Sequence, residues 1–262
     1  MARVGVVVPA YRPDVARLVE YVHALLDGLD PAVVRVELDA PTDATREALA
    51  ALPDRVYVNA VDRRRGKGAA VTAGFEALDT DVYAFADADG STPVASMADV
   101  VDPVVDGRTD LAVGSRRHPD ASVDAHQTFA RRFLGDGFAW LARRVLDTDL
   151  YDYQCGAKAL TAETWDAVRE HLREPGFAWD IELVALTGAL GYRVAEVPVR
   201  WEDQPGSTVA PVGTALRLAR GLLLARHRAR RLRGDRLHAA IGGRTDRSPA
   251  LVERLAADTT DE

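Results

Sequence analysis

Asp87 and Asp89 stand two positions apart, directly after the apolar run Val82–Ala86. Two carboxylates at the end of a strand can share one divalent cation. Mg²⁺ and Mn²⁺ prefer such hard oxygen ligands and keep coordination positions open for diphosphate oxygens. Asp-x-Asp turns also occur without any function, so the pair indicates a metal-assisted diphosphate site only together with other features.

A lysine between two glycines is a second candidate for anion binding. Gly66, Lys67 and Gly68 open a helix that is expected over residues 68–78. The glycines let the backbone approach a ligand, and the positive end of a helix favours an anion. An ordinary glycine-rich turn is an equal alternative. The segment is neither a Walker loop, which needs Ser or Thr after the lysine, nor a G-x-G-x-x-G fingerprint.

Two other strand ends carry residues that could contact a nucleotide. Pro9 and Tyr11 follow the first apolar run and could fix a loop against a flat base, although such a segment alone is more often a plain turn. Asp39 follows the second run and could accept hydrogen bonds from a base or a ribose. Asp43 is as well explained as the N-cap of the next helix.

The charge composition makes lysine exceptional in this chain. Of 33 cationic residues only Lys67 and Lys158 are lysine, while the 40 acids divide into 28 Asp and 12 Glu, with a formal net charge of −7. An Asp-rich, Lys-poor surface suits high salt and predicts a haloarchaeal type of cytoplasm, with a GC-rich genome as the alternative explanation. The two lysines therefore call for a specific reason.

Composition also excludes several classes of protein. The single cysteine, Cys155, rules out an intrachain disulfide framework and a thiolate zinc site. The net charge argues against a nucleic-acid partner. The chain shows no signal-peptide pattern and no run of about 20 apolar residues. We therefore expect a cytoplasmic protein that is at most peripheral on the inner face of the membrane.

The elements that must position these residues alternate between strand and helix in the first half. An α/β fold with a mostly parallel central sheet and helices on both faces is therefore expected, with ligands at the carboxyl ends of the strands. Strands are predicted at 3–9, 33–38, 55–58, 81–86 and 110–114, and helices at 14–28, 42–52, 68–78 and 95–105.

The second half is less regular. Its predicted elements are a long helix at 124–146, an irregular or strand-like segment at 151–160, helices at 163–172 and 181–190, a strand at 192–201 and a basic helix at 213–233. The remaining residues, 237–262, are predicted to form a flexible tail.

The basic helix within residues 213–236 has an amphipathic pattern. The segment contains eight Arg and one Asp. Leu218, Ala219, Leu222, Ala225 and Ala229 share one face of the helical wheel, and Arg217, Arg220, Arg228 and Arg231 lie opposite. Such a helix can lie on an anionic membrane surface or dock on the acidic body of the protein, and the sequence leaves both open.

Taken together, the motifs resemble glycosyltransferase family 2. VVVPAY, LDAPTDAT, RGKGAAVTAGFEAL, VYAFADADGSTP and DLAVGSR occur in the order and spacing of that family. DYQCGAKAL, WDIE and EVPVRWEDQPGSTV are similar to its dolichyl-phosphate glucosyltransferase and mannosyltransferase branch, nearer to the glucosyl members. The resemblance implies a GT-A fold over residues 1–212, with a nucleotide-sugar half at 1–118 and an acceptor half at 119–212.

The resemblance also implies roles for individual residues. Those implied in catalysis are Asp89, Asp180, Arg116 and Arg131. Those implied in donor binding are Pro9, Tyr11, Asp39, Gly66, Lys67, Asp87, Gln154, Lys158 and Ser207. The implied ligands of Mg²⁺ or Mn²⁺ are Asp87, Asp89 and Ser91, the last at a position where relatives often carry Gln. Glu182 and Trp201 match elements of the acceptor side.

Three segments depart from the family pattern. Arg12-Pro13-Asp14 replaces the usual Asn-Glu after the tyrosine, and only one acid, Asp39, leads the second motif. Thr208 stands where relatives often have Lys. These changes bear on the preference for base and sugar.

The predicted reaction moves a hexose, with inversion, from a UDP-glucose or GDP-mannose type of donor to a polyprenyl (dolichyl) phosphate. A phosphate monoester has a second pKa near 6, so it arrives as an anion and needs no general base. Asp180 is the candidate base if the acceptor is a hydroxyl. The alternatives are a family 2 transferase with a saccharide or small soluble acceptor, and a degenerate sugar-nucleotide-binding protein.

Overall fold

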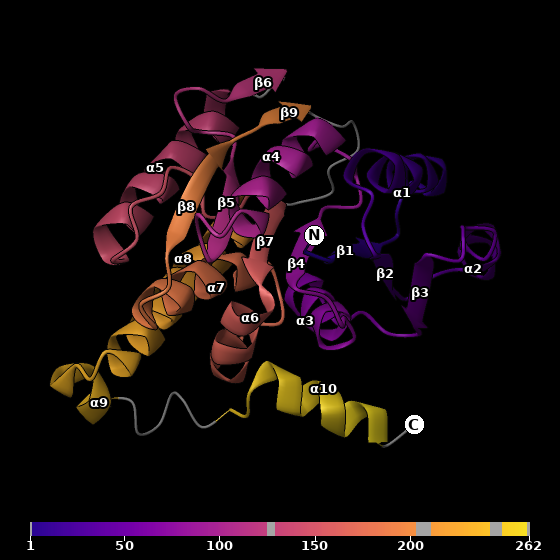
Figure 1. Ribbon diagram of the computed structural model, residues 1–262. Helices are drawn as coiled ribbons and strands as arrows, with labels where there is room; N and C mark the ends of the chain where they lie inside the picture. The colour runs from indigo at the N-terminus through magenta and orange to yellow at the C-terminus, as the bar shows by residue number, and fades with distance from the viewer. Residues whose placement is uncertain (1, 125–128, 203–210, 242–247, 261–262) are drawn as a thin grey trace.

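The structure is a computed structural model that describes residues 2–124, 129–202, 211–241 and 248–260. A seven-stranded sheet runs through the middle of the molecule, with helices on both faces (Figure 1). In spatial order its strands are β3 (Val56–Val61), β2 (Val33–Asp39), β1 (Val4–Tyr11), β4 (Val82–Ala86), β7 (Ala157–Thr161), β5 (Leu111–Ser115) and β8 (Val194–Pro198).

The sheet is parallel except at one strand. β7 runs antiparallel to both of its neighbours, β4 and β5, and the other strand pairs are parallel. Tyr11 is level with Asp39, so the carboxyl ends of β1 and β2 meet at one edge. Phe85 is level with Lys158, which brings β7 beside the strand that precedes Asp87. The predicted α/β class with a mostly parallel, mixed sheet is confirmed.

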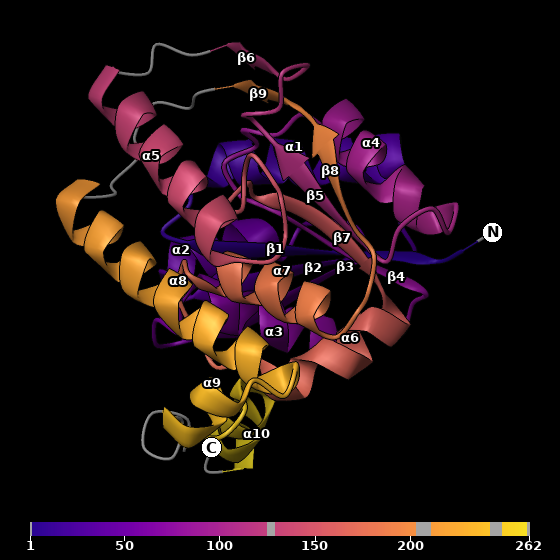
Figure 2. The same cartoon turned by 90° about the vertical axis from the view of Figure 1, so that its left-hand side faces the viewer.

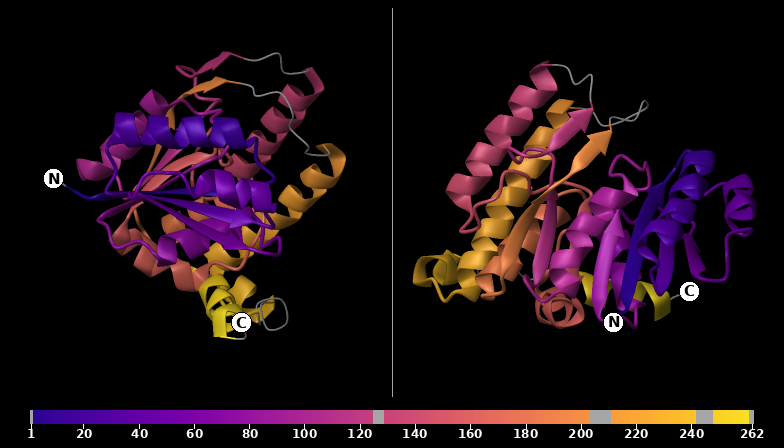
Figure 3. Two further views of the ribbon diagram at one scale, coloured as in Figure 1. Left: turned by 90° about the vertical axis from the view of Figure 1, so that its right-hand side faces the viewer. Right: turned by 45° about the horizontal axis from the view of Figure 1, so that its top comes forward.

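One face of the sheet is covered by α1 (Val15–Leu29) and α4 (Val94–Val105), with α2 (Asp43–Leu49) at the edge (Figure 3). Asp14 caps α1 by accepting a hydrogen bond from Arg17 N at 3.2 Å. The N-cap of α2 is Thr42, one residue before Asp43. The apolar core on this face includes Val6, Val8, Leu18, Val22, Leu25, Met97 and Val100.

The other face is covered by α3 (Lys67–Glu76), α6 (Ala162–Val168) with the short η1 (Arg169–His171), and α7 (Trp179–Ala189). The residues of α7 from Trp179 to Thr187 are all buried. A cluster of aromatic rings with centroids 5.0 to 6.5 Å apart fills the space between these helices and the sheet. It consists of Phe75, Phe85, Trp165 and Trp179.

Outside α7 lie α5 (Phe129–Val145) and α8 (Pro211–Leu232), side by side (Figure 2). Leu222, Ala225 and Ala229 of α8 are buried in the same core as α7. The predicted apolar face of the basic helix therefore docks on the protein body, which was one of the two interpretations of its pattern. None of the described helices has both the length and the apolar character needed to cross a bilayer.

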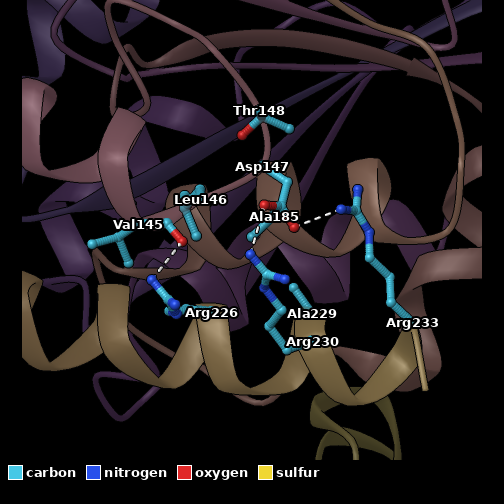
Figure 4. A pocket seen from close by; sticks show the side chains of 9 residues that line it. All are labelled: Val145, Leu146, Asp147, Thr148, Ala185, Arg226, Ala229, Arg230 and Arg233. Atoms are coloured by element: carbon cyan, nitrogen blue, oxygen red, sulfur yellow. Dashed lines mark hydrogen bonds and ion pairs between the residues drawn. The ribbon is translucent and has the colours of Figure 1, made fainter. Parts of the chain in front are cut away.

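Arginines attach the second half of α8 to the body (Figure 4). Arg230 and Arg233 pair with Asp147 at 3.0 and 2.5 Å, and Arg226 donates to the carbonyl of Val145 at 3.2 Å. Several of the arginines in this half of the helix therefore form ion pairs or hydrogen bonds within the protein.

Two predictions about the second half are wrong. The expected strand at 192–201 is two strands, because β8 belongs to the main sheet while β9 (Arg200–Glu202) pairs with β6 (Ser122–Asp124). The expected flexible tail contains α9 (Arg236–Ile241) and α10 (Leu251–Thr260).

The last helix is fixed by packing and by charge. Leu251 is buried, and its N–H donates to the carbonyl of Leu172 at 2.8 Å. Asp258 pairs with Arg63 at 2.5 Å. α10 therefore connects the segment before α3 to the segment after η1, and its residues Leu251, Val252 and Leu255 pack against the core.

Candidate active site

The carboxyl edge of the sheet gathers the residues that the sequence singled out. β1 ends at Tyr11, β2 ends at Asp39, and Asp87 follows the last residue of β4. Lys67, at the start of α3, forms ion pairs with Asp87 and with Asp180, which lies in the first turn of α7. These pairs bring Lys67 and Asp180 close to Asp87. Ligands of parallel sheets bind at this edge.

Asp87 is held by the segment before β7. Its N–H donates to the carbonyl of Gly156 at 3.0 Å. A Cβ atom on Gly156 would lie 1.9 Å from Oδ2 of Asp87, so the carboxylate packs directly on the bare glycine. Sequence reasoning missed Gly156, although it belongs to the Q-C-G segment of the family motif.

Asp87, Asp89 and Ser91 lie in the turn that follows β4, which we call the acidic turn. Oδ1 of Asp89 accepts from the Ser91 N–H at 2.9 Å. The Ser91 hydroxyl is buried and has no hydrogen-bond partner among the described residues. Two carboxylates and an unpartnered hydroxyl make an oxygen-only donor set that fits Mg²⁺ or Mn²⁺. Among the described residues there is no cluster of three or more His, Cys, Asp or Glu that could hold a metal ion.

Lys67 lies between two carboxylates. Its Nζ is 2.9 Å from Oδ1 of Asp87 and 3.2 Å from Oδ2 of Asp180. Burial alone would lower the pKa of Lys67, but Asp180 and Asp87 outweigh it and raise the pKa above its ordinary value. The ammonium therefore stays charged beside the acidic turn.

Asp180 also binds the second lysine. Nζ of Lys158 donates to Oδ1 of Asp180 at 2.7 Å and to the carbonyl of Cys155 at 2.8 Å. Burial would raise the pKa of Asp180, but Lys158 and Lys67 overcome this and lower it. A carboxylate held between two ammonium groups is a weak base, which argues against the general-base role considered for Asp180.

Asp39 organises the turn before α3. Its Oδ2 accepts from the N–H groups of Arg65 and Gly66 at 2.8 and 2.9 Å, and its Oδ1 accepts from Nε of Arg65 at 2.8 Å. The carbonyl of Pro175 accepts from the Ala69 N–H at 3.0 Å and closes the turn from the other side. Both oxygens of Asp39 are thus used within the protein. Arg65 begins the R-G-K-G segment of the family motif, but the sequence analysis gave it no role of its own.

Tyr11 is surrounded by guanidinium groups. Its ring is partly exposed and lies 4.2 Å from the Arg64 guanidinium carbon and 5.2 Å from that of Arg12. Arg12 and Ala40 have φ values of 49° and 45°, in the left-handed region that suits Asn or Gly better. Backbone strain of this kind gathers at functional sites.

Arg116 is fixed at the end of β5. It forms a two-pronged ion pair with Asp152, with Nε–Oδ2 and Nη2–Oδ1 distances of 2.7 and 3.0 Å. Burial would raise the pKa of Asp152, but Arg116 lowers it to about 2. The Gln154 N–H donates to the same carboxylate at 3.0 Å. Asp152 was missed although it is the acid of the D-x-Q segment.

Glu182, which matches an element of the acceptor side, is engaged in contacts within the protein. It is buried, accepts from the N–H groups of Arg173 and Glu174 at 2.9 and 2.8 Å, and pairs with Arg228 of α8. Its contacts hold a loop to a helix. Ser207 and the side chain of Arg131 lie outside the described part of the molecule, while Pro9 and Gln154 are half-buried.

This architecture is the GT-A fold of glycosyltransferases. A mannosyltransferase from Pyrobaculum calidifontis, in complex with GDP-mannose and Mn²⁺, superposes with a TM-score of 0.58 and 17% identity, over 99% of this chain and 80% of its own. A glucosyl-3-phosphoglycerate synthase from Mycobacterium tuberculosis, in complex with Mn²⁺, UDP-glucose and phosphoglyceric acid, superposes with a TM-score of 0.66 and 17% identity. The match covers 86% of this chain and 80% of the synthase.

The sequence comparisons identify the family. The model described as "Glycosyl transferase family 2" matches residues 5–156, and the chain belongs to this family. Glycosyltransferase AglD of Haloferax volcanii is 33% identical over 79% of this chain and 34% of its own length. A mouse dolichyl-phosphate beta-glucosyltransferase is 33% identical over 67% of this chain and 56% of its own length. An undecaprenyl-phosphate mannosyltransferase of Micrococcus luteus is 29% identical over 77% of this chain and 84% of its own length. The chain thus spans about a third to a half of the first two relatives.

Proposed function

We propose that this chain transfers a hexose, with inversion at the anomeric carbon, from a UDP-glucose or GDP-mannose type of donor to a polyprenyl (dolichyl) phosphate. The observation that carries the proposal is the convergence of Asp87, Asp89 and the Lys67 ammonium at the carboxyl edge of the sheet. A diphosphate and its cation can bind together at such an edge. The names of the mouse and Micrococcus luteus relatives support the lipid-phosphate acceptor.

Asp87, Asp89 and Ser91 are the residues that would hold Mg²⁺ or Mn²⁺. When bound, the cation supplies positive charge that stabilises the departing diphosphate. The charged Lys67 lies on the same side and adds to this stabilisation. Tyr11 and the turn at Gly66 would border the nucleotide, with Asp39 as the carboxylate that shapes the turn.

A phosphate acceptor suits a site without an assigned base. The Asp180 carboxylate is engaged by both lysines and is poorly suited to take a proton. A lipid phosphate is already anionic near neutral pH and can attack directly. Arg116 is a candidate to orient it, because a guanidinium has further N–H donors beyond the Nε and Nη2 bonds that Asp152 accepts. The implied roles of Gln154, Arg131 and Ser207 stay predictions.

A donor and acceptor panel tests the proposal. Radiolabelled UDP-glucose or GDP-mannose is mixed with dolichyl phosphate and Mn²⁺ or Mg²⁺, at low salt and in molar KCl. Label should appear in the lipid extract with one donor, and Asp89→Ala should lower its rate by about 10²- to 10³-fold. Asp99→Ala, at an exposed position of α4, is the matched control and should stay active.

Two results would replace the proposal with an alternative. Transfer to a soluble sugar or glycerate, with none to lipid phosphate, would reassign the acceptor. Tight nucleotide binding without transfer to any acceptor would favour a sugar-nucleotide-binding protein.

We also propose that the exposed side of α5 and of residues 216–223 of α8 rests on the inner face of the cytoplasmic membrane. Leu216 and Leu223 are 71% and 62% exposed, and Trp140 of α5 is 55% exposed. Arg220 adds an exposed positive charge on α8. Apolar side chains interleaved with arginine suit the surface of an anionic bilayer.

Replacing Leu216 and Leu223 together with Glu should release the protein from anionic vesicles in a flotation assay. Nucleotide affinity should be unchanged, because neither side chain takes part in the contacts of the acidic turn. Leu237→Glu, on α9 and equally exposed at 67%, is the control and should still float with the vesicles. Flotation of the double variant at the wild-type level would refute this face as the membrane contact.

A further inference from the structure

Four charged side chains of alternating sign form a row that leads from the interior to the acidic turn. Lys158, Asp180, Lys67 and Asp87 follow one another at distances of 2.7, 3.2 and 2.9 Å. The side chains of Lys158 and Asp180 are 0% and 2% exposed, those of Lys67 and Asp87 are 10% and 40% exposed. We call these four residues the charge row.

The members of the charge row come from four different elements. Lys158 lies on β7, Asp180 in the first turn of α7, Lys67 at the start of α3, and Asp87 just after β4. The ring of Phe85 lies beneath both ammonium groups, 5.0 and 5.4 Å from the two Nζ atoms. The row is therefore built by the tertiary fold and its geometry depends on all four elements.

Lys158 lies too deep to contact a substrate. Its ammonium is fully buried and donates to the Asp180 carboxylate and to the carbonyl of Cys155. Burying an ammonium and a carboxylate costs more in desolvation than the pair usually returns, and an apolar pair of the same size is often as stable. A gain in folding stability is therefore a weak explanation for a lysine at position 158. Because the charge row leads to the acidic turn, a role at that turn is a better explanation.

We infer that Lys158 is a positioning residue that acts through Asp180 to hold the Lys67 ammonium at the edge of the diphosphate site. Lys158 occupies Oδ1 of Asp180 and leaves Oδ2 to Lys67. Lys67 is thereby held at the level of Asp87, where its charge is available to an incoming phosphate. This inference rests on the proposed function, and it assigns Lys158 no direct contact with the donor, unlike the role that the family resemblance implied.

Removing the two buried members of the charge row separates positioning from stability. Lys158→Met leaves Asp180 with Lys67 as its one remaining partner in the row, so both the folding stability and the donor site should suffer. Lys158→Met combined with Asp180→Asn removes both buried charges, so the urea midpoint should return close to the wild-type value. In the double variant Lys67 still lacks its ion pair with the Asp180 carboxylate. The affinity of this variant for a nucleoside diphosphate should therefore stay about 10- to 100-fold weaker than that of the wild type, as when other outer-shell partners are removed.

The measurement is calorimetric titration of the wild type and both variants with UDP and with GDP in the presence of Mn²⁺, together with urea unfolding. Arg169→Met is the matched control, because it removes an ion pair with Glu76 at the far end of α3. It should lose some stability and keep its nucleotide affinity.

The outcomes distinguish the inference from the proposed function. A double variant that recovers both stability and wild-type affinity would overturn the positioning role and leave the proposed function intact. A wild-type protein that binds neither UDP nor GDP would count against the proposed function itself. Weak binding in Lys158→Met, together with weak binding in the double variant whose stability is restored, supports the inference.

Discussion

Replacing Gly156 with Ala should abolish cation-dependent transfer while the sheet stays folded. The new methyl group would lie 1.9 Å from Oδ2 and 2.1 Å from Cγ of Asp87, so the carboxylate must leave its place. A displacement of about 1 Å at a reacting site can cost about 10²-fold in rate, and we expect at least that loss in kcat/KM for the donor. The cost in folding stability should be about 1–3 kcal/mol, as for other overpacked positions.

The Gly156→Ala effect is measured as kcat/KM over a range of Mn²⁺ concentrations, with the melting temperature alongside. Gly137→Ala is the control, because a Cβ atom there meets nothing within 4 Å. It should keep full activity and equal or exceed the wild-type stability, since alanine favours a helix more than glycine does. An unchanged kcat/KM and Mn²⁺ dependence in Gly156→Ala would mean that Asp87 is not a required ligand.

Replacing Gly66 with Ala should weaken donor binding by tenfold or more. Gly66 has φ of 100°, and a Cβ atom there would lie 2.7 Å from the carbonyl oxygen of Pro175. Strain of this kind costs about 1–3 kcal/mol and can be relieved only by moving the turn. Because the Gly66 N–H binds Asp39 and the next residue is Lys67, the movement changes both.

Gly107→Ala is the matched control for Gly66→Ala. Gly107 also has a positive φ, 68°, but a Cβ atom there meets nothing within 4 Å. It should lose about 1–2 kcal/mol of stability from backbone strain alone, with donor affinity unchanged. The comparison is made by calorimetric titration with the nucleoside diphosphate. If the two variants lose affinity equally, or if Gly66→Ala loses none, then the turn does not shape the donor site.

Local signals predicted the sheet and the edge at which the site lies. Apolar, β-branched runs such as Val4–Val8 mark strands buried on both faces, and strand–helix alternation indicates that most of the strands are parallel. Asp39 and Asp87 could be found because each stands at the end of a predicted strand, and Lys67 because it stands at the start of a predicted helix. These signals depend on a few neighbouring residues and can be read directly from the sequence.

The contacts within the site could not be predicted, because they depend on long-range packing. Lys158 contacts Asp180 because β7 lies antiparallel beside β4 in the sheet. No local sequence pattern predicts that position of β7. The same holds for Asp152 and Arg116, which are 36 residues apart. The break between β8 and β9 and the docking of α10 likewise depend on partners far along the chain.

This geometry gives a physical reason why Lys67 and Lys158 are lysine in a chain whose other cations are arginine. Lys67 and Lys158, which the resemblance assigned to the donor, both belong to the charge row, and one of them is sealed from solvent. A compact ammonium fits between Asp180 and the Phe85 ring, where a planar guanidinium would need more room. Arginine elsewhere in the chain has no such restriction.

The arginines of α8 have a consequence for how the molecule would meet a bilayer. Arg226, Arg230 and Arg233 bind the region around Asp147, and Arg228 binds the buried Glu182. The helix cannot peel away from the body without breaking these pairs, so on the proposed function the whole domain settles on the lipid as one rigid unit. The height of the acidic turn above the headgroups is then set by the fold, and only phosphates carried at that height can react.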